Sequence, residues 1–83
     1  MDTTTLERLI TDAIPGATAE AADPANSGDH FEVTVMSESF EGVSPVEQHR
    51  MVYAALGGAM SEEIHALTIR TMTPAQAGGI EED

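Results

Sequence analysis

The stretch HFEVTVMS, residues 30–37, decides the fold because it contains the clearest strand signal in the chain. Three apolar side chains, Phe31, Val33 and Val35, alternate there with more polar ones. A period of two residues is typical of a strand with one buried face and one face that is wet or only partly covered. We therefore expect helices from the flanking segments to pack on the apolar face.

Two further strands are expected beside this one. A weaker candidate at residues 17–23 precedes it, and the turn-forming run PANSGD at residues 24–29 separates the two. Their closeness in sequence favours an antiparallel hairpin. The alternating segment HALTIRT, residues 65–71, follows two helical pieces. A connection through helices allows this third strand to lie parallel to the strand at 30–37, with a right-handed crossover.

The first helix is predicted from apolar residues that recur at helical spacing between residues 6 and 14. Thr4 and Glu7 have the T-x-x-E spacing of a capping box at its start. Pro15 and Gly16 end it.

The second helix is expected to begin at Ser44, which forms a capping box with Glu47, and Pro45 occupies the first helical position, where proline is favoured. Gly57 and its neighbour break the helix before a short helical piece, AMSEEI. The face of the second helix expected to be buried carries Val46, His49, Val52, Tyr53, Leu56 and Met60. In the loop before this helix, the aromatic Phe40 is predicted to plug the core.

The predicted order is therefore α-β-β-α-α-β, with a further helical turn after Thr73 and Pro74. This is an α+β domain whose three-stranded mixed sheet is covered by helices on one face. We expect one domain at residues 1–77 and a disordered acidic tail at residues 78–83. No apolar run approaches the roughly 20 residues that cross a bilayer, and no secretory signal is recognised, so the sequence predicts a cytoplasmic protein without membrane contact.

Charge is the strongest compositional feature. Fifteen acidic residues face three arginines and no lysine, for a formal net charge of -12 at pH 7. Such self-repulsion is relieved by high salt, so the composition indicates a salt-rich cytoplasm, as in a halophilic archaeon; an ordinary acidic protein is the plainer alternative. Nucleic-acid binding normally needs a basic patch, which three arginines can hardly build. The chain has no cysteine, which excludes disulfides and thiolate metal ligands of its own.

Three histidines are the side chains best suited to bind a metal near neutral pH. His49, in the middle of the apolar helix face, is interpreted as structural. His30 and His65 begin the two strands expected to be parallel neighbours, so they should share one rim of the sheet and could share a metal. The plainer interpretation of each is an exposed surface histidine. Two imidazoles are half of a four-ligand zinc site or two-iron cluster, so another molecule would supply the remaining ligands.

The segments HFEVTVMSESFEGVSPVEQHRMVYAALG (30–57) and IHALTIRTMTPAQ (64–76) resemble the BolA family, and the resemblance extends roughly over residues 6–77. It implies a fold similar to a type II KH domain. It also implies pairing with a monothiol glutaredoxin-like protein and a [2Fe-2S] cluster shared across that interface. His65 and His30 correspond to the family's ligands, while the glutaredoxin cysteine and a low-molecular-weight thiol such as glutathione would complete the set.

The resemblance also bears on the residues around His49 and on the arginines. The family's usual Arg-His-Arg is replaced here by Gln48, His49 and Arg50, which we interpret as one lost positive charge at a contact surface. Arg50 and Arg70 are candidates for partner binding, and Arg50 is also expected to reach a nearby carboxylate or helix end. The isolated chain is expected to be a monomer.

Three functions follow from these observations. The leading hypothesis is a non-enzymatic accessory protein in iron–sulfur cluster trafficking or in iron and redox regulation, because no nucleophile motif, P-loop or dinucleotide fingerprint is present. The alternative is a DNA-binding, stress-response transcriptional regulator that uses the KH-like fold. A third hypothesis is an interaction domain that binds no metal.

Overall fold

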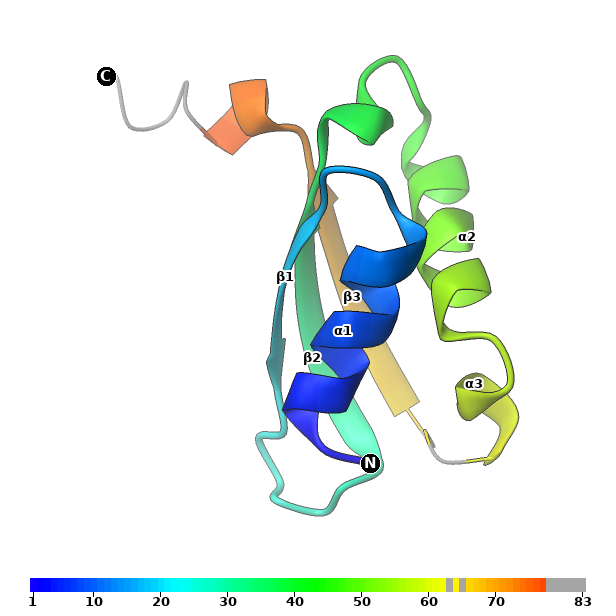
Figure 1. Cartoon of the computed structure of the whole chain (residues 1–83). Helices are drawn as coiled ribbons and strands as arrows, with labels where there is room; N and C mark the ends of the chain where they lie inside the picture. The colour runs from blue at the N-terminus through cyan, green and yellow to red at the C-terminus, as the bar shows by residue number, and fades with distance from the viewer. Residues whose placement is uncertain (63, 65, 78–83) are drawn as a thin grey trace.

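The computed structural model describes residues 1–62, 64 and 66–77. Its elements, in chain order, are α1 (Thr3–Ala13), β1 (Thr18–Ala22), β2 (His30–Met36), the 3-10 helix η1 (Glu38–Phe40), α2 (Pro45–Leu56), α3 (Ala59–Glu62) and β3 (Ala66–Met72). A helical turn at residues 74–77 follows β3 (Figure 1). This order confirms the predicted α-β-β-α-α-β succession. The acidic tail predicted at residues 78–83 lies outside the described residues.

The sheet has the strand order β1-β2-β3. β1 and β2 pair antiparallel with Thr18 opposite Met36, and β2 and β3 pair parallel with His30 opposite Ala66. Both the predicted hairpin and the predicted parallel crossover are therefore confirmed. The crossover through α2 and α3 returns the chain to the end of the sheet at which β2 begins (Figure 1).

The core lies between the helices and one face of the sheet. Alternation along β2 sends every second side chain into this core, and the intervening ones emerge on the opposite face, which we call the open face. Burial of this apolar area is the main favourable term in folding. The buried hydrophobic residues are Leu6, Ile10, Ile14, Phe31, Val33, Val35, Phe40, Val52, Leu56 and Ile64.

The first helix begins earlier than the predicted capping box allows. Asp2 is its N-cap, and the Asp2 carboxylate accepts a hydrogen bond from the backbone N–H of Thr5 at 2.8 Å. Glu7 is therefore not needed at the cap. Its carboxylate instead accepts a hydrogen bond from the backbone N–H of Ala21 on the edge strand β1, at 2.9 Å. A helix side chain thus satisfies a donor that would otherwise be exposed at the sheet edge.

The start of α2 and the loop before it match the sequence predictions. The Ser44 hydroxyl accepts a hydrogen bond from the backbone N–H of Glu47 at 3.3 Å, and Pro45 is the first helical residue. Phe40, at the end of η1, is 1% exposed and plugs the core. At its other end α2 stops at Gly57, whose φ of +54° is a conformation that glycine adopts without a Cβ penalty.

The predicted buried face of α2 is wrong in part. Val46 and Tyr53 are 62% and 43% exposed, whereas Gln48, Val52 and Leu56 face the interior. The buried positions follow an i, i+4, i+8 spacing, so the face that packs on the core is centred on Val52 and has the polar Gln48 at its N-terminal end. A prediction based only on the positions of apolar residues therefore assigned the buried face of α2 incorrectly in part.

Among the described residues, no helix combines the length and the apolar character needed to cross a membrane.

Candidate metal-binding rim

The first residue of β2 presents an imidazole at the end of the sheet. His30 is exposed, and its ring Nδ1 lies 2.6 Å from Oδ1 of Asp29. The two side chains are 48% and 46% exposed, so both remain in contact with solvent. A carboxylate on one ring nitrogen fixes the tautomer and orientation of a histidine that ligates through the other. A metal would accordingly be bound through Nε2.

The turn that precedes β2 is shaped by Asp23. Its carboxylate accepts hydrogen bonds from the backbone N–H groups of Ser27 at 3.1 Å and Gly28 at 2.8 Å. Asn26 and Gly28 have φ values of +53° and +78°, which suit these two residue types in tight turns. This local network sets the entry of the chain into β2 and thereby positions the imidazole at its first residue.

The start of β3 lies beside the start of β2. Ala66 is the register partner of His30, and the backbone N–H of Ala66 donates to the carbonyl of Asp29 at 3.1 Å. The predicted parallel pairing thus brings the two strand starts together. His65, which precedes Ala66 in the sequence, lies outside the described residues, so its pairing with His30 stays a prediction. Within the part of the chain that the structure describes, no three His, Asp or Glu side chains gather in a metal-binding arrangement.

The other predicted site residues fall on two different surfaces. Arg50 is on the outside of α2, and its guanidinium pairs with the Glu47 carboxylate three residues earlier. This confirms the expected contact of Arg50 with a nearby carboxylate. Arg70 is exposed on β3. His49 is half-buried beside the inward face of α2. Partner binding by the two arginines and a structural role for His49 stay predictions.

Gln48 is a residue that the sequence interpretation placed incorrectly. It is 8% exposed and therefore does not mark a charge lost from a contact surface. Its amide nitrogen donates to the carbonyl of Val43 at 2.7 Å, and its amide oxygen accepts from the Thr71 hydroxyl at 2.5 Å. The side chain joins the loop before α2 to the end of β3. Its i, i+4, i+8 spacing with two buried apolar residues was the signal that could have revealed this role.

Comparisons with known proteins agree on one family. The family model described as BolA-like protein matches residues 8–76. The Homo sapiens BolA-like protein 1 is 49% identical over 55 residues, which are 66% of this chain and 40% of that protein. The Vibrio cholerae DNA-binding transcriptional regulator BolA is 48% identical over 50 residues, 60% of this chain and 47% of that protein. The chain thus spans less than half the length of these two curated relatives.

Solved structures of BolA proteins superimpose on nearly the whole chain. A bolA protein homologue from Coxiella burnetii superimposes with a TM-score of 0.83 at 33% identity, covering 94% of this chain and 97% of that one. The solution structure of BolA1 from Mus musculus gives a TM-score of 0.78 at 34% identity, covering 95% of this chain and 70% of that one.

Proposed function

Because the chain belongs to the BolA-like protein family, we propose that it is a non-enzymatic accessory protein that pairs with a monothiol glutaredoxin-like partner and shares a [2Fe-2S] cluster with it. In this role it would act in iron–sulfur cluster trafficking or in iron and redox regulation in the cytoplasm. His30 and His65 would ligate the cluster from this side. The partner's cysteine and a low-molecular-weight thiol would ligate it from the other.

The observation that carries the proposal is the arrangement of His30. The imidazole stands exposed at the rim where β2 and β3 both begin, and the Asp29 carboxylate contacts its Nδ1. A carboxylate behind a histidine fixes the orientation of the ring and directs the opposite nitrogen toward a metal. Two-iron clusters accept a pair of histidines in place of a pair of cysteines. This donor chemistry fits a chain that has no cysteine of its own.

The proposal is tested on the complex purified anaerobically with a monothiol glutaredoxin and glutathione. We expect the double variant His30→Ala/His65→Ala to lose the visible absorption of the cluster. Asp29→Asn should retain the fold but hold the cluster roughly ten- to a hundredfold more weakly, the usual cost of losing an outer-shell carboxylate. His49→Asn removes the third histidine and is the matched control. Cluster absorption that survives unchanged in the double variant rejects the assignment.

A DNA-binding regulator is the second candidate, because the relatives from Vibrio cholerae and Escherichia coli carry that name. The charge of this chain opposes it. Phosphate contacts come mainly from lysine and arginine side chains, whereas this chain has only three arginines and no lysine, and Arg50 already pairs with Glu47. Gel-shift titrations at several salt concentrations distinguish the two functions. Salt-sensitive DNA binding without glutaredoxin would favour the regulator.

A further inference from the structure

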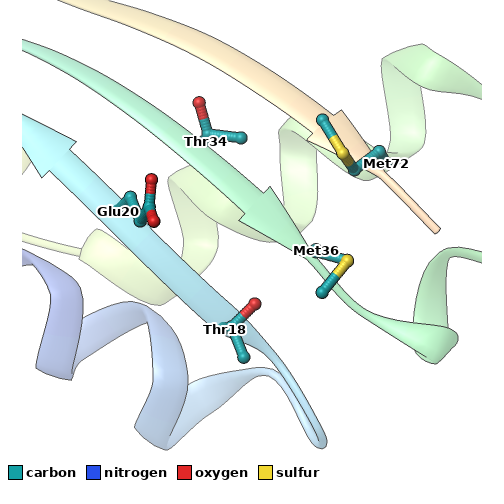
Figure 2. Close-up of a pocket in the computed structure, with 5 residues that line it drawn as sticks. All are labelled: Thr18, Glu20, Thr34, Met36 and Met72. Carbon is teal, nitrogen blue, oxygen red and sulfur yellow. The ribbon is translucent and has the colours of Figure 1, made fainter. Parts of the chain in front are cut away.

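The open face of the sheet carries a cavity at the end opposite His30. It holds about 210 Å³ and is lined by Thr18, Glu20, Thr34, Met36 and Met72. Figure 2 shows these side chains on the three strands, on the side of the sheet away from the helices. The strand register explains the grouping, because Met36 is paired with both Thr18 and Met72, and Thr34 is paired with Glu20.

The size of the cavity restricts what it can hold. Sites for small-molecule ligands and cofactors usually enclose roughly 300–1,000 Å³, so a hollow of about 210 Å³ is too small for most of them. It is large enough for one long side chain. The occupant that fits is therefore a residue of another protein rather than a free cofactor.

The lining selects the chemistry of that side chain. Met36 and Met72 offer thioethers, which are polarizable and adapt to an alkyl chain laid against them. Glu20 adds an exposed carboxylate, and within the described residues it forms no ion pair. A side chain with an aliphatic stem and a positive end satisfies both features at once. A phosphate or carboxylate would instead be repelled.

Charged side chains on the two edge strands determine which way a charged occupant of the cavity points. Glu20 is paired with Thr34, and Thr34 with Arg70, so the acidic and basic side chains lie on the two edge strands, roughly 10 Å apart between Cα atoms. The structure records no ion pair between them within its described residues. A cationic group is thus attracted toward the β1 side of the cavity and repelled from the β3 side.

We propose that this cavity receives an arginine side chain of a partner protein, with the guanidinium paired to Glu20 and the aliphatic stem packed on Met36 and Met72. The planar guanidinium can meet the carboxylate with two hydrogen bonds, which the lysine ammonium cannot do. At low ionic strength the net charge of -12 adds a long-range attraction for basic partners, whereas at high salt only the contacts inside the cavity remain. The cavity lies about 20 Å along β2 from His30, so this surface does not depend on the proposed cluster.

The methionines allow a direct test by NMR. With ¹³C-labelled methionine methyl groups, we titrate the protein with a blocked pentapeptide that has a central arginine flanked by two valines and two outer threonines. We expect saturable shifts of the Met36 and Met72 methyl signals, while those of Met51 and Met60, on the helical side of the molecule, stay in place. Replacing the central arginine by glutamate or lysine gives the two control peptides.

A pair of glutamate variants completes the design. Glu20→Gln should weaken binding of the arginine peptide about twofold to fivefold, the range expected for an exposed ion pair. Glu32→Gln, on the open face two residues along β2 from Thr34, is the matched control and should leave the affinity unchanged. The proposal is overturned if no methyl shifts, if the glutamate or lysine peptide binds equally well, or if Glu20→Gln has no effect. Shifts that follow protein concentration without peptide would assign the surface to a second copy instead, which also overturns it.

Discussion

Replacing Gln48 by methionine should destabilise the protein by about 2 kcal/mol. The amide makes two short hydrogen bonds, to the Val43 carbonyl at 2.7 Å and from the Thr71 hydroxyl at 2.5 Å, and a long one to the Phe40 carbonyl at 3.4 Å. A hydrogen bond contributes about 1 kcal/mol net, so the two short ones account for the estimate. Methionine has a similar length and keeps the packing, which restricts the change mainly to the lost polar contacts.

The assay is equilibrium urea unfolding followed by far-UV circular dichroism, because the chain has no tryptophan and its single tyrosine, Tyr53, is already 43% exposed. A loss of about 2 kcal/mol should lower the urea midpoint by roughly 1–2 M and the melting temperature by roughly 8–16 °C for a domain of this size. All measurements use one high KCl concentration, so that screening of the net charge of -12 is constant.

A double-mutant cycle isolates the bond across α2 and β3. Thr71→Val removes the hydroxyl and keeps the shape of the side chain, and we expect Gln48 and Thr71 to show a coupling energy of about 0.5–1.5 kcal/mol. If Gln48→Met unfolds within about 0.5 kcal/mol of the wild type, or if the cycle shows no coupling, the argument that this amide holds the helix to the strand is refuted.

Two further predictions concern α1. Glu7→Ala should speed hydrogen exchange at the Ala21 amide by about fivefold, because one hydrogen bond of about 1 kcal/mol is lost. Glu7→Gln keeps an acceptor and should leave the exchange rate nearly unchanged. Equal exchange rates in the two variants would contradict the contact. The hydrogen bond from the Thr5 backbone lowers the pKa of Asp2 in the folded protein below its ordinary value of 3.8. The stabilisation by this cap is therefore present above pH 3.8 and is lost as the pH falls through the lowered pKa. The difference in urea midpoint between wild type and Asp2→Ala should therefore shrink on acidification, and a difference independent of pH would argue against the cap.

Local rules explain what the sequence predicts correctly. Ser44 followed by Pro45 specifies a helix start, and the alternation around Val33 specifies a strand, because each depends on neighbours in the chain. The start of α1 is harder to predict because Asp2 competes with three consecutive threonines for the cap position. The inward face of α2 depends on Gln48 and its partners at sequence separations up to 23 residues, which no local pattern contains.

The same distinction holds for the candidate sites. The turn before β2 and the parallel crossover were enough to predict that His30 stands at the rim beside the start of β3. The contact with Asp29 depends on side-chain orientation and was not predicted. The cavity between Met36 and Met72 was missed for a different reason. These residues are 36 positions apart, and only the register of two parallel strands brings them together.

The acidic composition bears on how such a protein recognises partners. At an ionic strength near 1 M the Debye length is about 3 Å, so the long-range attraction that a net charge of -12 exerts is almost completely screened. Selectivity must then come from groups in direct contact. Two thioethers beside a carboxylate meet this requirement, because alkyl packing does not weaken with salt even though the pair with the exposed carboxylate is screened. Glu20 with Met36 and Met72 is the proposed contact of this kind. We expect salt up to about 1 M to weaken binding of the arginine peptide less than it weakens the long-range attraction of cationic groups to the negatively charged protein. If both fell equally steeply, direct contacts in the cavity would not be what selects the partner.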